Sequence, residues 1–185
     1  NLDLNTRINL EIHETLRRNK KGALLWILDK TSTAMGGRLL KNWLEQPLLD
    51  KKTIEKRLEI VELFVNDVIL MEEVKNKLKN IYDLERITGK ISYGNCNARD
   101  LYALKISIKE IPELKELLIK SNKEPLVNLG LKIDSLNDIY ELIDKAIVDS
   151  PPLSVKEGGL IKKGYNSELD ELKSANKDGK KWLAS

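Results

Sequence analysis

The stretch SLNDIYELIDKAI, residues 135–147, decides the fold class of this chain. Its apolar residues recur every three or four positions, which places them on one face of an α-helix. Ser135, with Asp138 three residues later, resembles a capping box and predicts that the helix begins there. Pro151 and Pro152 are expected to stop the helix, because proline has no backbone N–H to continue the hydrogen-bond ladder. The apolar positions of this face are Leu136, Ile139, Tyr140, Ile143, Ala146 and Ile147.

The same spacing recurs along most of the chain. Further helices are predicted to begin after Thr33, Asp50, Asp67 and Asn97, whose side chains can accept hydrogen bonds from the first free backbone N–H groups. Pro112 is expected to kink or end the helix that follows Asn97. Short helices are predicted near residues 3–14 and 23–28, and a last helix after Gly164.

Loops and strands leave few signals. Gly89 and Gly94 are expected to bracket one loop, and residues 121–125 to form another. Alternation of apolar and polar residues is scarce, and only residues 153–163 are candidates for extended structure. The sequence therefore predicts an all-α fold, a multi-helix core domain with a terminal helix.

Composition excludes several classes of protein. The 185 residues are 41% hydrophobic and 33% charged, which is typical of one or two soluble domains, and the apolar runs are far shorter than the ~20 residues of a membrane span. Cys96 is the single cysteine and His13 the single histidine, too few ligands for a structural zinc site. The net charge of +3 does not by itself indicate a nucleic-acid surface.

The glycine-rich stretch GGLIKKG, residues 158–164, invites comparison with a phosphate-binding loop. Such a loop needs Lys and then Ser or Thr directly after its last glycine, but Tyr165 and Asn166 follow Gly164. A turn with positive φ angles is the better interpretation.

Other reactive side chains are isolated. No motif places a nucleophile beside His13, and Cys96 is best explained as an idle thiol. The neighbouring carboxylates Glu72–Glu73 and Asp170–Glu171 point about 100° apart on a helix and do not form an acid–base pair. Trp26, Trp43 and Trp182 are interpreted as packing residues. We therefore predict no catalytic, cofactor-binding or metal-binding residue in this chain.

Three stretches together resemble the MutS family of DNA mismatch-repair proteins, in its helical core and lever region. The first comprises LEI (residues 10–12), LWILD (25–29) and TSTAMGGRLLKNWLEQPLLD (31–50). The second is DLERI (83–87) followed by Arg99-Asp100-Leu101. The third is AIVDSPP (146–152) running into GGLI (158–161) and GYNSELDEL (164–172). They occur in family order over nearly the whole chain. Two departures are Ala98, where the family usually has proline, and Lys173, where arginine is common.

The resemblance implies roles for two motifs. In the first, glycines 36 and 37 would allow close helix packing, and Arg38 would hydrogen-bond carbonyls at a helix end. In the second, Asp83 and Arg86 would brace one helical face. Tyr165-Asn166 would open the lever.

The resemblance also implies the domain organisation. Residues 1–165 would form the core domain, and residues 166–185 would begin a lever helix that leads to a DNA clamp outside this chain. Because the chain starts at Asn1 and ends within a helical pattern, we expect a piece of a longer protein. That parent would be a cytoplasmic, homodimeric, DNA-dependent ATPase that needs ATP and Mg²⁺, binds mismatched duplex DNA and recruits a MutL-type protein. The chain itself would couple nucleotide state to the clamp and would not be an enzyme.

Two alternatives remain open at this point. The chain could be the core of a MutS paralogue that serves recombination, or an unrelated helical interaction scaffold.

Overall fold

The computed structural model describes residues 2–183, with side chains up to residue 176. The described part of the chain is built from helices, and its one β contact is an isolated antiparallel bridge between Ile147 and Ile161. The predicted all-α fold is confirmed. The helices are α1 (Leu4–Asn9), α2 (Leu24–Leu28), α3 (Ala34–Glu45), α4 (Lys51–Asn66), α5 (Val68–Lys79), α6 (Leu84–Ser92), α7 (Ala98–Lys120), α8 (Glu124–Leu131), α9 (Asn137–Ala146), the 3₁₀ turn η1 (Val155–Glu157) and α10 (Ser167–Leu183).

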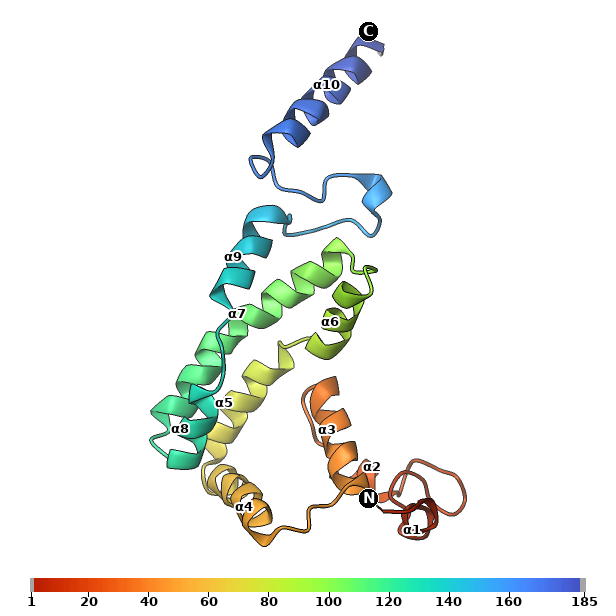
Figure 1. Ribbon diagram of the computed structural model, residues 1–185, viewed down its shortest axis with the longest axis vertical. Coiled ribbons are helices and arrows are strands. Elements are labelled where there is room, and N and C mark those ends of the chain that lie inside the picture. Colours follow the sequence, from red (N-terminus) through yellow and green to blue (C-terminus); the bar gives the residue numbers. More distant parts are fainter. Residues whose placement is uncertain (1, 184–185) are drawn as a thin grey trace.

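Helix α7 is the spine of the molecule (Figure 1). It contacts α5, α6, α8 and α9, so four helices are held on a single 23-residue rod. Helix α10 extends away from this bundle at one end, and α1 to α3 lie at the other. No helix among residues 2–183 is long and apolar enough to cross a membrane.

Two hydrophobic clusters lie along α7. The first joins its beginning to α9 and to the segment around Ile161, through the buried Ala98, Ile143, Ala146 and Ile147. The second joins its end to α4, α5 and α8, through the buried Leu70, Leu118 and Leu126. Because one helix contributes to both clusters, the two ends of the bundle are mechanically continuous.

The four predicted helix caps are confirmed. Thr33, Asp50 and Asp67 accept hydrogen bonds from the backbone N–H groups three residues later, at 2.9–3.1 Å. Asn97 forms a full capping box with Asp100.

The predicted start and end of α9 are wrong. Leu136 occupies the N-cap position with φ +50°, and its N–H donates to Asp134 at 3.0 Å, so Ser135 and Asp138 form no capping box. The helix ends at Ala146, before the two prolines, because the backbone of Ile147 is extended and pairs with Ile161.

Two further expectations need correction. Of the two outcomes expected at Pro112, a kink or an end, the end is wrong: α7 continues past it, because buried apolar residues on both sides, such as Ile111 and Leu114, hold the helix together despite a proline cost of ~3 kcal/mol. Gly89 lies inside α6, and of the two glycines only Gly94 belongs to the loop, with φ +68°. The segment 153–163 contains η1 and the single bridge.

Candidate functional site

The residues considered as reactive from the sequence do not form a site. His13 Nε2 lies 2.7 Å from Glu45 Oε1, without the alignment of a hydrogen bond. Cys96 is half-buried and its thiol donates to the Asn97 carbonyl; burial raises its pKa, which disfavours a reactive thiolate. Within the described residues no group of three or more His, Cys, Asp or Glu side chains could hold a metal ion.

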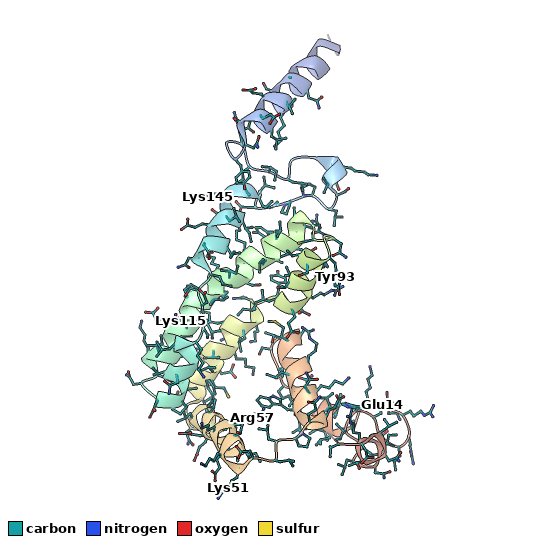
Figure 2. All side chains as sticks on the ribbon, in the orientation of Figure 1. Glu14, Lys51, Arg57, Tyr93, Lys115 and Lys145 are labelled. Carbon is teal, nitrogen blue, oxygen red and sulfur yellow. The ribbon has the colours of Figure 1, made fainter. Side chains whose placement is uncertain are left out.

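The remaining candidates have structural environments. Glycines 158, 159 and 164 all have positive φ, as the turn interpretation predicted. Glu72 pairs with Lys75 on the same helix rather than with Glu73. Trp43 stacks against the guanidinium of Arg57, 3.8 Å from the ring centroid, and joins α3 to α4; Arg57 is labelled in Figure 2. Trp26 is 52% exposed, and Trp182 lies outside the residues whose side chains are described.

An ionic bridge connects the N-terminal helices to the bundle. Arg38 on α3 donates two parallel hydrogen bonds to Asp83, from Nη1 at 2.9 Å and Nη2 at 2.7 Å, and two more to Glu85. Arg38 therefore binds carboxylates at the start of α6, and the expectation that it binds helix-end carbonyls is wrong. We call Arg38, Asp83 and Glu85 the Arg38 bridge.

The Arg38 bridge explains an unusual carboxyl group. Hydrogen bonds from Arg38 lower the pKa of Asp83 to about 2, helped by the bond that Asp83 accepts from the backbone N–H of Arg86. Asp83 thus caps α6 and holds α3 at once, and it does not pair with the side chain of Arg86 as the family pattern suggested. The two hydrophobic clusters include no residue before Ile60, so this link is mainly polar.

A second polar cluster joins α7 to α9. Lys105 is 5% exposed, and its ammonium group donates to Asp144 at 3.0 Å and Asp149 at 2.6 Å. Burial alone would lower the pKa of Lys105, but the two carboxylates outweigh it and raise that pKa. The hydrogen bonds from Lys105 lower the pKa of both aspartates. We call these three residues the Lys105 cluster.

The chain after α9 is also fixed to α7 through its backbone. Arg99 on α7 donates to the carbonyl of Pro151 at 2.9 Å. Two backbone bonds close the bridge region, from Val148 N–H to Leu160 at 3.1 Å and from Lys162 N–H to Ala146 at 2.8 Å. Residues 147–162 are therefore bound to α7 at Pro151 and closed by backbone bonds beside the end of α9.

Helix α10 begins from this fixed segment. Asn166 caps it by accepting from Leu169 N–H at 2.9 Å. Asp170 accepts from Gly164 N–H at 2.6 Å, and the ammonium group of Lys173 donates to the carbonyl of Ile161 at 3.1 Å. We call Ile161, Gly164, Asp170 and Lys173 the α10 joint. Asp170 and Lys173 tie the first turns of α10 back to the segment that precedes it.

Sequence reasoning missed the polar links. Nothing local in the sequence pairs Lys105 with Asp144 or Lys173 with Ile161, because these partners lie 39 and 12 residues apart. Arg38 was singled out because it lies in the motif of residues 31–50, but that motif did not indicate Asp83 and Glu85 as its partners.

Comparison with known proteins shows which family this chain resembles. The sequence matches the family model described as MutS domain III over residues 5–179. It is similar to the DNA mismatch repair protein MutS of Halothermothrix orenii, Clostridium botulinum and Clostridium tetani, with 54%, 52% and 50% identity over 185 residues. These matches cover 100% of this chain and 21%, 20% and 21% of the relatives. The chain thus spans about a fifth of the length of the curated relatives it matches.

Proposed function

The chain belongs to the MutS family, in which it corresponds to domain III, and we propose that it is the core that couples nucleotide state to DNA grip in a mismatch-repair protein. The observation that carries this proposal is the unbroken connection along α7. One helix links the Arg38 bridge region, through α6, to the Lys105 cluster and the α10 joint.

The proposal assigns a mechanical task to each link. A rotation of α1 to α3 is passed to the bundle by the Arg38 bridge. The bundle moves as one body, because both hydrophobic clusters share α7. The Lys105 cluster and the α10 joint then pass the motion to α10, which points away from the bundle (Figure 1). A rigid connection between two distant sites is what coupling of this kind requires.

The chain's own residues do not fit ATP or Mg²⁺. The turn at residues 158–164 lacks the Lys-Ser/Thr pair of a phosphate-binding loop, and the described carboxylates form no metal-binding group. We therefore place ATP and Mg²⁺ binding in another part of the protein and propose no catalytic residue here.

The wider proposal follows the family. The whole protein would be a cytoplasmic homodimer that binds mismatched duplex DNA and recruits a MutL-type protein. The repair role is favoured over a recombination paralogue because the similar relatives are named as mismatch-repair proteins.

The α10 joint offers a direct test in the full-length protein that carries this chain. Asp170→Ala with Lys173→Ala removes both ties, and Glu171→Ala with Lys163→Ala is the matched control, because both of those residues are exposed. The measurement is how long the protein stays bound to a mismatched duplex whose two ends are blocked, before and after ATP is added.

We expect the joint variant to bind ATP and mismatched DNA normally but to lose most of the ATP-dependent change in lifetime. The control is expected to respond as the wild type does. A joint variant with a full ATP response would contradict the proposal.

A further inference from the structure

The loop between α1 and α2 concentrates positive charge. The sequence RRNKK, residues 17–21, holds four cationic side chains and no carboxylate, whereas the formal net charge of the whole chain is +3. The rest of the chain together therefore carries a net charge of −1. We call residues 14–22 the basic loop; its four cations are Arg17, Arg18, Lys20 and Lys21.

These cations are free to bind. All four side chains are exposed, and none forms an ion pair with the side chains that the structure describes. Other exposed basic residues, such as Lys51 and Lys120, pair with a glutamate one turn away on their own helix. The basic loop thus differs from the solvated helix faces that account for most lysines of the chain.

The basic loop has a defined conformation. The N–H of Thr15 donates to the carbonyl of Asn19 at 2.9 Å, and that of Arg18 donates back to the carbonyl of Thr15 at 2.7 Å. Leu16 N–H donates to Glu11 at 2.5 Å. The turn closes at Gly22, with φ +97°, beside the fully buried Ala23. An ordered turn fixes the backbone positions from which the four charged side chains project, so the backbone loses little conformational entropy on binding.

A hollow of about 640 Å³ adjoins the loop. Lys20, Lys30 and Lys41 line it together with Trp26, against the carboxylates of Glu14 and Asp29. Asp29 is already engaged, since it accepts from the hydroxyl of Thr31 at 2.7 Å and from its N–H at 3.1 Å. Glu14 is the first residue of the basic loop, and its label in Figure 2 shows that the loop lies far from α10. Lys41 also lies 3.8 Å from Glu45, so the charges of the hollow are largely balanced and the excess positive charge is that of the basic loop itself.

We infer that the basic loop binds the phosphate backbone of duplex DNA, without reading base sequence. The inference rests on the proposed function, which makes DNA the polyanion that this protein meets. Four unpaired cations on an ordered turn match closely spaced phosphates by charge, and contacts of this kind add affinity but no specificity. Because the loop and α10 lie at opposite ends of the molecule in Figure 1, this contact is separate from any DNA contact made beyond α10.

The test uses the full-length protein and a fully matched duplex without nucleotide. The loop variant carries Arg17→Gln, Arg18→Asn, Lys20→Gln and Lys21→Gln; asparagine is chosen at position 18 because φ is +57° there and asparagine tolerates that region. The control variant carries Lys52→Gln, Lys56→Gln, Lys109→Gln and Lys132→Gln. It loses the same charge from four exposed lysines that are dispersed over the bundle.

The readout is the slope of log binding constant against log salt concentration. Each lost phosphate contact lowers the magnitude of that slope by about 0.9. We expect a fall of ~2–4 for the loop variant and of less than ~1 for the control. Affinity for mismatched duplex should fall by the same factor as for matched duplex, and unchanged thermal melting of both variants shows that they fold.

An unchanged slope in the loop variant, or an equal fall in the two variants, would overturn the inference and leave an acidic protein surface as the partner to be sought. A loss confined to mismatched duplex would also overturn it, because phosphate contacts carry no sequence information. The coupling proposal is tested separately, because the loop variant should keep the ATP-dependent change in DNA lifetime, whereas the α10 joint variant should lose it.

Discussion

Arg38 on α3 binds Asp83 at the start of α6 through two parallel hydrogen bonds of 2.9 and 2.7 Å. The two residues are 45 positions apart in sequence and belong to parts of the molecule that share no hydrophobic cluster. Paired N–H donors fix the orientation of the carboxylate as well as its distance. The placement of α3 on the bundle therefore depends on the geometry of this guanidinium group, together with the stacking of Trp43 on Arg57 between α3 and α4.

Removing Arg38 should change the titration of Asp83. The pKa of Asp83 is lowered to about 2 in the folded chain, so its stabilising effect is present above the ordinary value of 3.8 and is lost as pH falls toward 2. In Arg38→Gln the pKa should rise toward 3.8 but stay below it, because the backbone bond from Arg86 remains. Carboxyl-carbon NMR measures this shift. Arg57→Gln should leave it unchanged, and a wild-type midpoint near 3.8 would disprove the bridge.

Ser107 should be needed for stability although it is small. Its side chain is fully buried, accepts from the N–H of Tyr82 at 2.9 Å and donates to the carbonyl of Ala103 at 2.8 Å. Ser107→Ala removes two hydrogen bonds, each of which contributes about 0.5–1.5 kcal/mol, and should lower the free energy of unfolding by ~1–3 kcal/mol. Urea denaturation measures the loss. The exposed Ser92→Ala is the control, within about 0.5 kcal/mol of wild type; equal loss in both variants would argue against this role.

Two helical glycines should respond in opposite directions to alanine. A Cβ at Gly130 on α8 would lie 3.2 Å from the carbonyl oxygen of Lys115 and 3.2 Å from Leu118, so α8 would have to move off α7. We expect Gly130→Ala to destabilise the fold by ~1–3 kcal/mol.

Gly89 on α6 has nothing within 4 Å of such a Cβ, and Gly89→Ala should stabilise the helix by ~0.5–1 kcal/mol. The same denaturation experiment compares the two variants. A stabilising effect at Gly130 would mean that α7 and α8 do not pack as closely as described.

The isolated chain should neither hydrolyse ATP nor distinguish mispaired from matched DNA. It lacks the residues of a phosphate-binding loop after Gly164. A phosphate-release assay and duplex binding measure both activities. ATPase activity that follows the chain through two unrelated purification steps would refute the expectation.

The helices were largely predictable from the sequence because their signals are local. Apolar spacing and side-chain caps act within one or two turns, and the caps at Thr33, Asp50, Asp67 and Asn97 are found as expected. The errors arose where contacts between residues far apart in the sequence determine where a helix ends. Pairing of Ile147 with Ile161 ends α9 early, and burial on both sides of Pro112 keeps α7 intact.

The candidate site was less predictable for the same reason. Its links connect residues such as Lys105 and Asp149, whose separation of 44 positions leaves no periodic trace. Lys173 could be noticed only as a departure from the family pattern, and its contact with the Ile161 carbonyl explains why a cation suits that position.

The central claim is that the bundle and α10 move as one rigid unit. Spin labels at Lys145 on α9 and Glu171 on α10, both exposed, would report their separation in the full-length protein by pulsed electron paramagnetic resonance. The account predicts a single narrow distance distribution that is the same without nucleotide and with ATP bound. A distribution that shifts when ATP binds would show that α10 pivots on the bundle, and would contradict the account.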